Sequence, residues 1–194
     1  MLAIVFDPIS TVIAVAAVLI SWRAYVLTKR APREARQATL RDQLRAVLEP
    51  ALEELNEHLS EIERGHDVGE SWAAVTAADK LLGSIGSRQT DPLPMQAFHS
   101  QTQSGLGLAE AQWSSARHSQ WAFSVMAADL ADWERKDASG PALKEGIAQG
   151  RTELERLRRE RDAAISRLSS ALKTAIARVE KEIQVLDKAD VRGR

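Results

Sequence analysis

The chain has 194 residues, with 26 Lys and Arg against 27 Asp and Glu, which gives a formal net charge of −1 at pH 7. This balance argues against a general electrostatic attraction to nucleic acid, and the absence of cysteine excludes disulfides, thiol nucleophiles and thiolate metal sites. A hydrophobic content of 44% with 5% aromatic residues and 6 prolines predicts an all-α fold.

Residues 8–28 predict a transmembrane helix. Asp7 followed by Pro8 is a typical helix start, and residues 9–22 contain no charge. The segment has about the 20 residues that a bilayer core requires. A cleaved signal peptide is disfavoured, because the basic residues follow the apolar run instead of preceding it. A buried helix of a soluble domain is the alternative that remains.

Small residues recur every three or four positions along this predicted span. Such spacing lets two helix backbones approach closely in lipid, where apolar side chains gain little by leaving the acyl chains. An alanine-rich span also contains this pattern by chance, so a helix interface and a chance pattern both stay open. The residues of the predicted interface are Ser10, Ala14, Ala17, Ser21, Ala24 and Thr28.

Basic residues cluster immediately after the span, whereas the tail of residues 1–7 has no Lys or Arg. The positive-inside rule therefore predicts a single-pass protein of the inner or plasma membrane, with a short outer tail and a cytoplasmic body. Residues 29–39 form a basic juxtamembrane linker in this prediction, in which Pro32 kinks or restarts the helix. The residues predicted to set topology or contact lipid headgroups are Arg23, Lys29, Arg30, Arg33 and Arg36.

The remaining residues, 40–194, predict a bundle of helices. Apolar residues at helical spacing indicate helices at about 40–64, 71–82, 106–136 and 141–189. Glycine and proline between residues 83 and 94 predict a loop. From Trp121 to Trp133 the apolar residues are distributed around the whole helix, which predicts a central helix buried on all sides.

The last helix has the most regular apolar stripe of the chain. A helix of this length needs a long partner, either the helix at residues 40–62 or the same helix of another copy in a coiled coil. Arg161 interrupts the stripe and would specify the register of that pairing. The predicted coiled-coil face consists of Leu154, Leu157, Ile165, Leu168, Leu172, Ile176, Val179, Ile183 and Leu186.

Motifs for catalysis or metal binding are not evident. The four histidines lack the spacing that places two metal ligands on one helix face. Glu54, Glu57, His58 and Glu61 resemble the carboxylate and histidine ligands of di-metal bundles, but no second Glu-x-x-His motif accompanies them. His58 is therefore predicted to be a core histidine, and we expect no cofactor, no nucleic acid and no small-molecule substrate.

The layout of one N-terminal span and a coiled-coil-rich body is similar to that of small bacterial or prophage membrane proteins and of the inner-membrane spanins of phage lysis. Spanins keep their coiled coil outside, opposite to the orientation that the charges predict here. The sequence thus predicts a helical interaction or scaffold protein that self-associates or tethers a partner at the membrane. An envelope or lysis protein is the first alternative, and a metal-binding or enzymatic bundle is the second.

Overall fold

The computed structural model describes the backbone of residues 8–88, 96–135 and 141–192, and nearly all side chains from Gln37 to Ile85, His99 to Arg135 and Lys144 to Ala189. Every element within these ranges is an α-helix, which confirms the predicted all-α fold. The helices are α1 (Pro8–Glu63), α2 (Ala73–Arg88), α3 (Gln96–Arg135) and α4 (Pro141–Arg192).

The chain divides into two units, Met1–Gln43 and Leu44–Arg194, and the helical bundle belongs to the second. In the first unit the predicted transmembrane helix is helical in backbone, but its interface and headgroup side chains lie outside the described residues. Only Trp22 and Tyr25 are described there, both exposed, with ring centroids 6.4 Å apart. Among the described residues, no helix combines the length and the apolar character needed to cross a membrane. The span therefore stays a prediction.

Helix α1 begins at Pro8 and continues through Pro32 and Pro50. The sequence predicts a kink or restart at Pro32, but the structure has one helix there, and residues 29–39 are part of it. Pro50 is exposed, so the pyrrolidine ring and the backbone carbonyl that loses its partner can face water.

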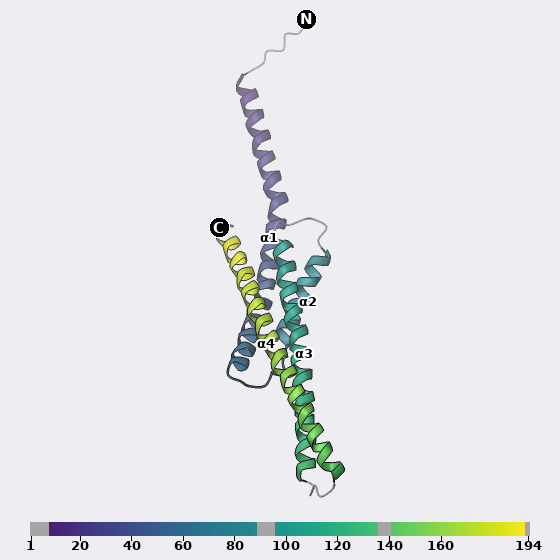
Figure 1. Ribbon diagram of the computed structural model, residues 1–194. Helices are drawn as coiled ribbons and strands as arrows, with labels where there is room; N and C mark the ends of the chain where they lie inside the picture. The colour runs from purple at the N-terminus through teal and green to yellow at the C-terminus, as the bar shows by residue number, and fades with distance from the viewer. Residues whose placement is uncertain (1–7, 89–95, 136–140, 193–194) are drawn as a thin grey trace. The chain divides into compact units, whose positions relative to one another are not determined.

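In the second unit the end of α1 lies antiparallel to the end of α4. Arg45 Nη2 lies 2.7 Å from Asp187 Oδ1, and Lys173 Nζ lies 3.0 Å from Glu63 Oε1, so the ion pairs fix both ends of the contact. Between these ion pairs the two helices run side by side (Figure 1), and each carries buried apolar residues there. The predicted partner of α4 at residues 40–62 is therefore present in the same chain, from Leu44 onward.

Helices α3 and α4 form a long antiparallel hairpin that extends beyond the ends of α1 and α2 (Figure 1). Thr102 is bonded to Glu182 near one end, and Arg151 is bonded to Glu134 near the other. At Gly150 an added Cβ would lie 3.1 Å from Leu130 Cδ1, so the glycine allows the helices to approach closely. Thus α3 is the long partner that the stripe of α4 requires.

Helix α2 covers part of α3 and is longer than the sequence predicts. The predicted loop after residue 82 is helical as far as Arg88, and α3 begins at Gln96 instead of about residue 106. At Gly83 an added Cβ would lie 2.8 Å from Gln103 Nε2 on α3. Gly83 therefore lies inside a helix, facing the end of the Gln103 side chain, instead of in a turn.

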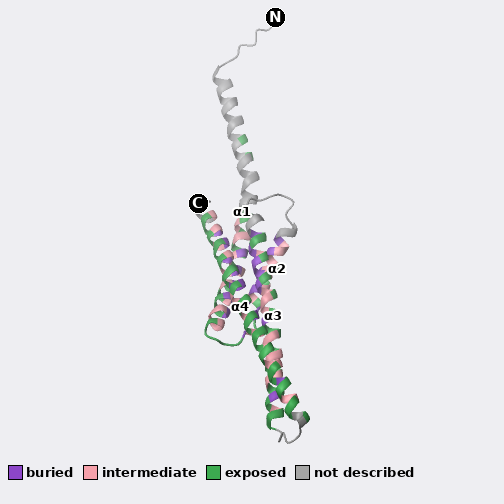
Figure 2. Ribbon diagram, viewed as in Figure 1, coloured by how far each residue is buried: buried purple, intermediate pink, exposed green. Residues whose placement is uncertain are grey.

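The core is thick where four helices meet and thin where only the hairpin remains (Figure 2). The prediction that Trp121 to Trp133 are buried on all sides is wrong. Trp121 is 63% exposed, Val125 41% and Trp133 38%. The physical reason is that α4 covers one side of this part of α3, and α1 and α2 end before they reach it.

Candidate functional site

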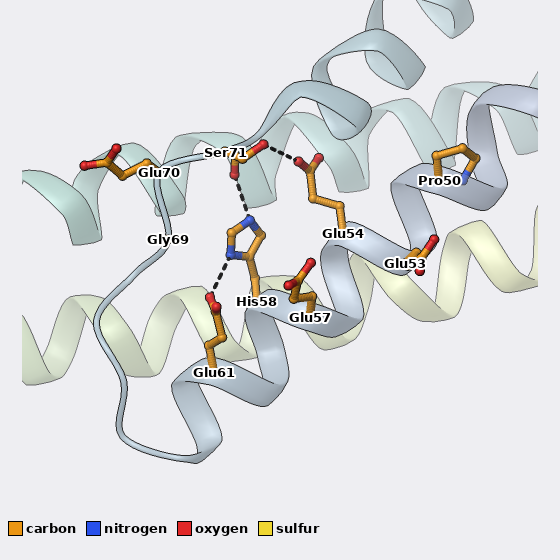
Figure 3. Close-up of a pocket in the computed structure, with 9 residues that line it drawn as sticks. All are labelled: Pro50, Glu53, Glu54, Glu57, His58, Glu61, Gly69, Glu70 and Ser71. Atoms are coloured by element: carbon orange, nitrogen blue, oxygen red, sulfur yellow. Dashed lines mark hydrogen bonds and ion pairs between the residues drawn. The ribbon is translucent and has the colours of Figure 1, made fainter.

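A strongly acidic pocket lies between the second half of α1 and the segment that connects α1 to α2 (Figure 3). Its volume is about 300 Å³, and no Lys or Arg lines it. The lining residues are Pro50, Glu53, Glu54, Glu57, His58, Glu61, Gly69, Glu70 and Ser71. This pocket contains the Glu and His residues that resemble a di-metal site in the sequence, so it is the first place to look for chemistry.

Glu54 is the N-terminal cap of α2. Its Oε1 accepts hydrogen bonds from Ser71 Oγ at 3.0 Å and from Ala73 N at 3.1 Å, and its Oε2 accepts one from Val75 N at 2.9 Å. The first N–H groups of a helix have no partner within the helix, and a carboxylate also interacts favourably with the helix dipole there. Glu54 therefore has a structural role that joins α1 to α2.

His58 is a core histidine, as the sequence predicts. It is 6% exposed, and its Nε2 donates to the Ser71 carbonyl oxygen at 2.8 Å. The other ring nitrogen, Nδ1, lies 3.5 Å from Glu61 Oε2. That distance is too long for a good hydrogen bond, and Nδ1 has no hydrogen-bond partner. Across the ranges that the structure describes, no three His, Asp or Glu side chains could together hold a metal ion.

An aromatic stack continues from His58 through the connecting segment to α3. The His58 and Trp72 ring centroids are 5.2 Å apart, Trp72 and Trp113 are stacked at 5.2 Å, and the Arg117 guanidinium lies 5.1 Å from the Trp113 ring. Trp113 Nε1 also donates to the Gly69 carbonyl oxygen at 3.2 Å. The stack anchors the α1–α2 connection to α3, beside an open groove of about 650 Å³.

A buried polar cluster joins α3 to α4. Glu182 is 1% exposed, its Oε1 lies 2.7 Å from His99 Nδ1, and its Oε2 accepts a hydrogen bond from Thr102 Oγ1 at 3.0 Å. A carboxylate at this depth is costly unless it is paired, and His99 supplies the pair. The sequence periodicity does not reveal this cluster. Glu182 is a charged residue next to Ile183 of the apolar stripe, and its position alone does not predict that it is buried.

The predicted coiled-coil face of α4 is used within the chain. Leu168, Leu172, Val179 and Leu186 are buried. Its other members are half-buried, namely Leu154, Leu157, Ile165, Ile176 and Ile183. The Arg161 guanidinium lies 4.3 Å from the Phe123 ring centroid, so the charge that interrupts the stripe stacks on an aromatic ring of α3.

The exposed part of α3 is the feature that the other elements do not explain. Trp121 and Val125 lie one helical turn apart and are both exposed, on the hairpin beyond α2. The His118 and Trp121 ring centroids are 6.1 Å apart. The sequence indicates this surface through the apolar residues all around the helix, and the structure shows which of them remain uncovered.

Comparison with known proteins gives no relative to guide the assignment. No family model, no curated protein and no solved structure matches the chain. The candidate site must therefore be judged on its own geometry. Glu54 and His58 of the acidic pocket make hydrogen bonds that join α1 to α2, and Glu182 of the buried cluster contacts His99 and Thr102, whereas Trp121 and Val125 are exposed.

Proposed function

We propose that the protein is a membrane-anchored helical interaction protein with no catalytic role. Its body self-associates or holds a protein partner at the cytoplasmic face of the membrane. The observation that carries this proposal is the exposure of Trp121 and Val125 on a helical hairpin. Exposed tryptophan is costly in water, and tryptophan is enriched among the residues that dominate protein interfaces.

The membrane part of the proposal rests on the sequence. The uncharged run of residues 9–22 has the composition of a span, and the basic residues that follow it have the charge of a cytoplasmic flank. A membrane anchor confines the body to the layer next to the membrane and raises its effective concentration, so a contact of low affinity can still form. The spaced small residues from Ser10 to Thr28 would then offer a second contact within the membrane.

The polar groups of the bundle favour this proposal over an enzyme. Glu54 and His58 are engaged in capping α2 and in binding Ser71, and Glu182 is paired with His99. An envelope or lysis protein remains the alternative, and it requires the body on the outer side of the membrane.

A size measurement of the full chain tests the interaction. In mild detergent, multi-angle light scattering is expected to find a species larger than one chain, and Trp121→Glu is expected to reduce its amount by about tenfold. Leu108→Glu is the matched control, because Leu108 is 49% exposed on the same helix but belongs to the part beside α2. A monomeric wild-type chain that also retains no partner after cross-linking in membranes would contradict the proposal.

A further inference from the structure

The middle of the hairpin contains an unusual length of uncharged helix. Residues 118–128 carry no Asp, Glu, Lys or Arg. Among the described helices only α4 packs along this part of α3, and Val68 of the α1–α2 connection donates to Gln120 Oε1 at its start. Exposed helices normally carry charges on the side that faces water. By composition, this stretch is suited to burial on a second side.

One row of residues on the uncovered side has the spacing of a coiled-coil seam. Its members alternate by four and three positions, which keeps them on one face of the helix. All of them are exposed except Asp132, which is half-buried. This row, called the α3 seam below, consists of Ser114, His118, Trp121, Val125, Ala128 and Asp132.

We infer that the α3 seam docks in antiparallel orientation on the α3 seam of a second copy, about a two-fold axis beside Ser124. The inference rests on the proposed interaction function and specifies the partner and the surface. Two properties of the seam, its distribution of side-chain size and its distribution of charge, favour another copy over an unrelated protein.

The seam has a large residue before Ser124 and smaller residues after it. In the antiparallel arrangement, Trp121 of one copy meets Val125 and Ala128 of the other, and the reverse contact occurs across the axis. A large ring thus packs over a small and a medium side chain, which is how facing helices interdigitate. Each copy would bury much of one exposed indole, whose full area is about 150–250 Å².

The two ends of the same surface carry opposite charges. Arg117 precedes the uncharged stretch, whereas Asp129 and Asp132 follow it. Arg117 lies seven residues before Ser124, and Asp129 and Asp132 lie five and eight residues after it. The antiparallel arrangement therefore brings Arg117 of each copy to a level between these two aspartates of the other. A two-fold contact requires such self-complementarity, since residue i meets residue j and j meets i. A parallel arrangement would instead place arginine beside arginine.

The outer face of α4 is a poorer candidate for this contact. Arg156 is bonded to Glu153 and Glu160 on the same helix, and Arg151 is bonded to Glu134. These charges are satisfied within the chain and exposed to water. Docking of that face would remove solvated ion pairs from water without new partners.

Disulfide trapping tests the surface and its direction together, because the natural chain has no cysteine. Ser124→Cys in the full chain, in membranes under mild oxidation, is expected to give a covalent dimer, since the two thiols lie near the axis. Ser114→Cys is the matched control on the same seam. Its two thiols would be roughly 30 Å apart at 1.5 Å per residue, so it should stay monomeric. Dimers from both variants would indicate parallel docking and overturn the proposed orientation.

A mixing experiment tests the charges between copies. Two variants are compared: Arg117→Asp, and the double variant Asp129→Arg with Asp132→Arg. In a dimer of either variant, like charges meet at both ends of the contact, so each variant by itself is expected to dimerise about tenfold more weakly. An equal mixture of the two restores opposite charges at both ends of the mixed pair and should recover dimer formation. No recovery, with both variants helical by circular dichroism, would overturn the charge pairing.

The outcomes separate this inference from the proposed function. If the wild-type chain forms larger species that Trp121→Glu disrupts, but Ser124→Cys gives no dimer, the interaction function stands and the antiparallel contact about Ser124 is wrong. If the chain is monomeric but cross-linking in membranes captures another protein that Trp121→Glu releases, the interaction function stands and the second copy is wrong. If the chain is monomeric and cross-linking captures no partner, both fail.

Discussion

Trp72 and Trp113 stack with ring centroids 5.2 Å apart and ring planes inclined by 19°, although they lie 41 positions apart in the chain. Trp72 precedes α2 and is 5% exposed, whereas Trp113 lies on α3. The pair therefore attaches the α1–α2 connection to the middle of the hairpin. It also marks the level at which four-helix packing gives way to two helices.

Trp113→Ala is expected to destabilise the bundle by about 3–5 kcal/mol, because it removes the stacked ring and the hydrogen bond to the Gly69 carbonyl. Urea unfolding followed by far-ultraviolet circular dichroism measures the loss. Trp121→Ala is the control, since its ring is exposed, and it should cost less than about 1 kcal/mol. Equal losses for the two variants would contradict the structural role of the stack.

His99→Leu is expected to cost about 3–5 kcal/mol, because it removes the ion-pair partner of the buried Glu182 carboxylate and leaves it only the hydrogen bond from Thr102. Replacing both residues by leucine should recover most of that loss, since the unpaired charge is then absent. Unfolding of the two variants in urea gives the comparison. If the double variant is less stable than His99→Leu, the pair contributes net stability and the expectation is wrong.

Glu54→Ala removes three hydrogen bonds to the start of α2 and is expected to destabilise the chain by about 1–2 kcal/mol. Glu57→Ala changes an exposed carboxylate of the same pocket and should have little effect. Hydrogen exchange at Ala73 and Val75 reports on the cap directly. Unchanged exchange in Glu54→Ala would show that the cap is dispensable.

The exposed ion pairs of α4 predict a small dependence of stability on pH. The hydrogen bond from Arg156 lowers the pKa of the Glu153 carboxyl. Because this carboxyl pKa is lower in the folded chain, the ionised Glu153 stabilises the fold at pH values above its pKa in the unfolded chain, about 4.3. The contribution is lost as the pH falls through the pKa of Glu153 in the folded chain. The thermal midpoint of Arg156→Gln should therefore lie slightly below that of the wild type at pH 6 and equal it near pH 2. A difference that persists at the lower pH would contradict this assignment.

Periodic positions were predictable from the sequence because helix packing repeats every three or four residues. The stripe of α4 follows this rule, and Leu168, Leu172 and Val179 are in the core. His58 also follows from its place on an apolar face. The second partner of α4, helix α3, was not predictable, because the uncharged stretch of α3 has no single stripe that identifies the side facing α4.

Contacts that depend on one glycine or one polar pair could not be read from the sequence. Gly83 has the appearance of a loop residue, but it lies within α2 and faces the Gln103 side chain. The pairing of His99 with Glu182 depends on the register of α3 against α4, which only the assembled hairpin defines. The exposure of Trp121 similarly depends on where α1 and α2 end.

The side of the membrane on which the body lies is the most direct test of the proposed function. Ser170 is exposed on α4, so a Ser170→Cys chain can be treated in intact cells with a membrane-impermeant thiol reagent, beside an Ala3→Cys chain. We expect labelling of Ala3→Cys in intact cells and labelling of Ser170→Cys only after the membrane is opened. Labelling of Ser170→Cys in intact cells would contradict the cytoplasmic tether and favour the envelope or lysis alternative.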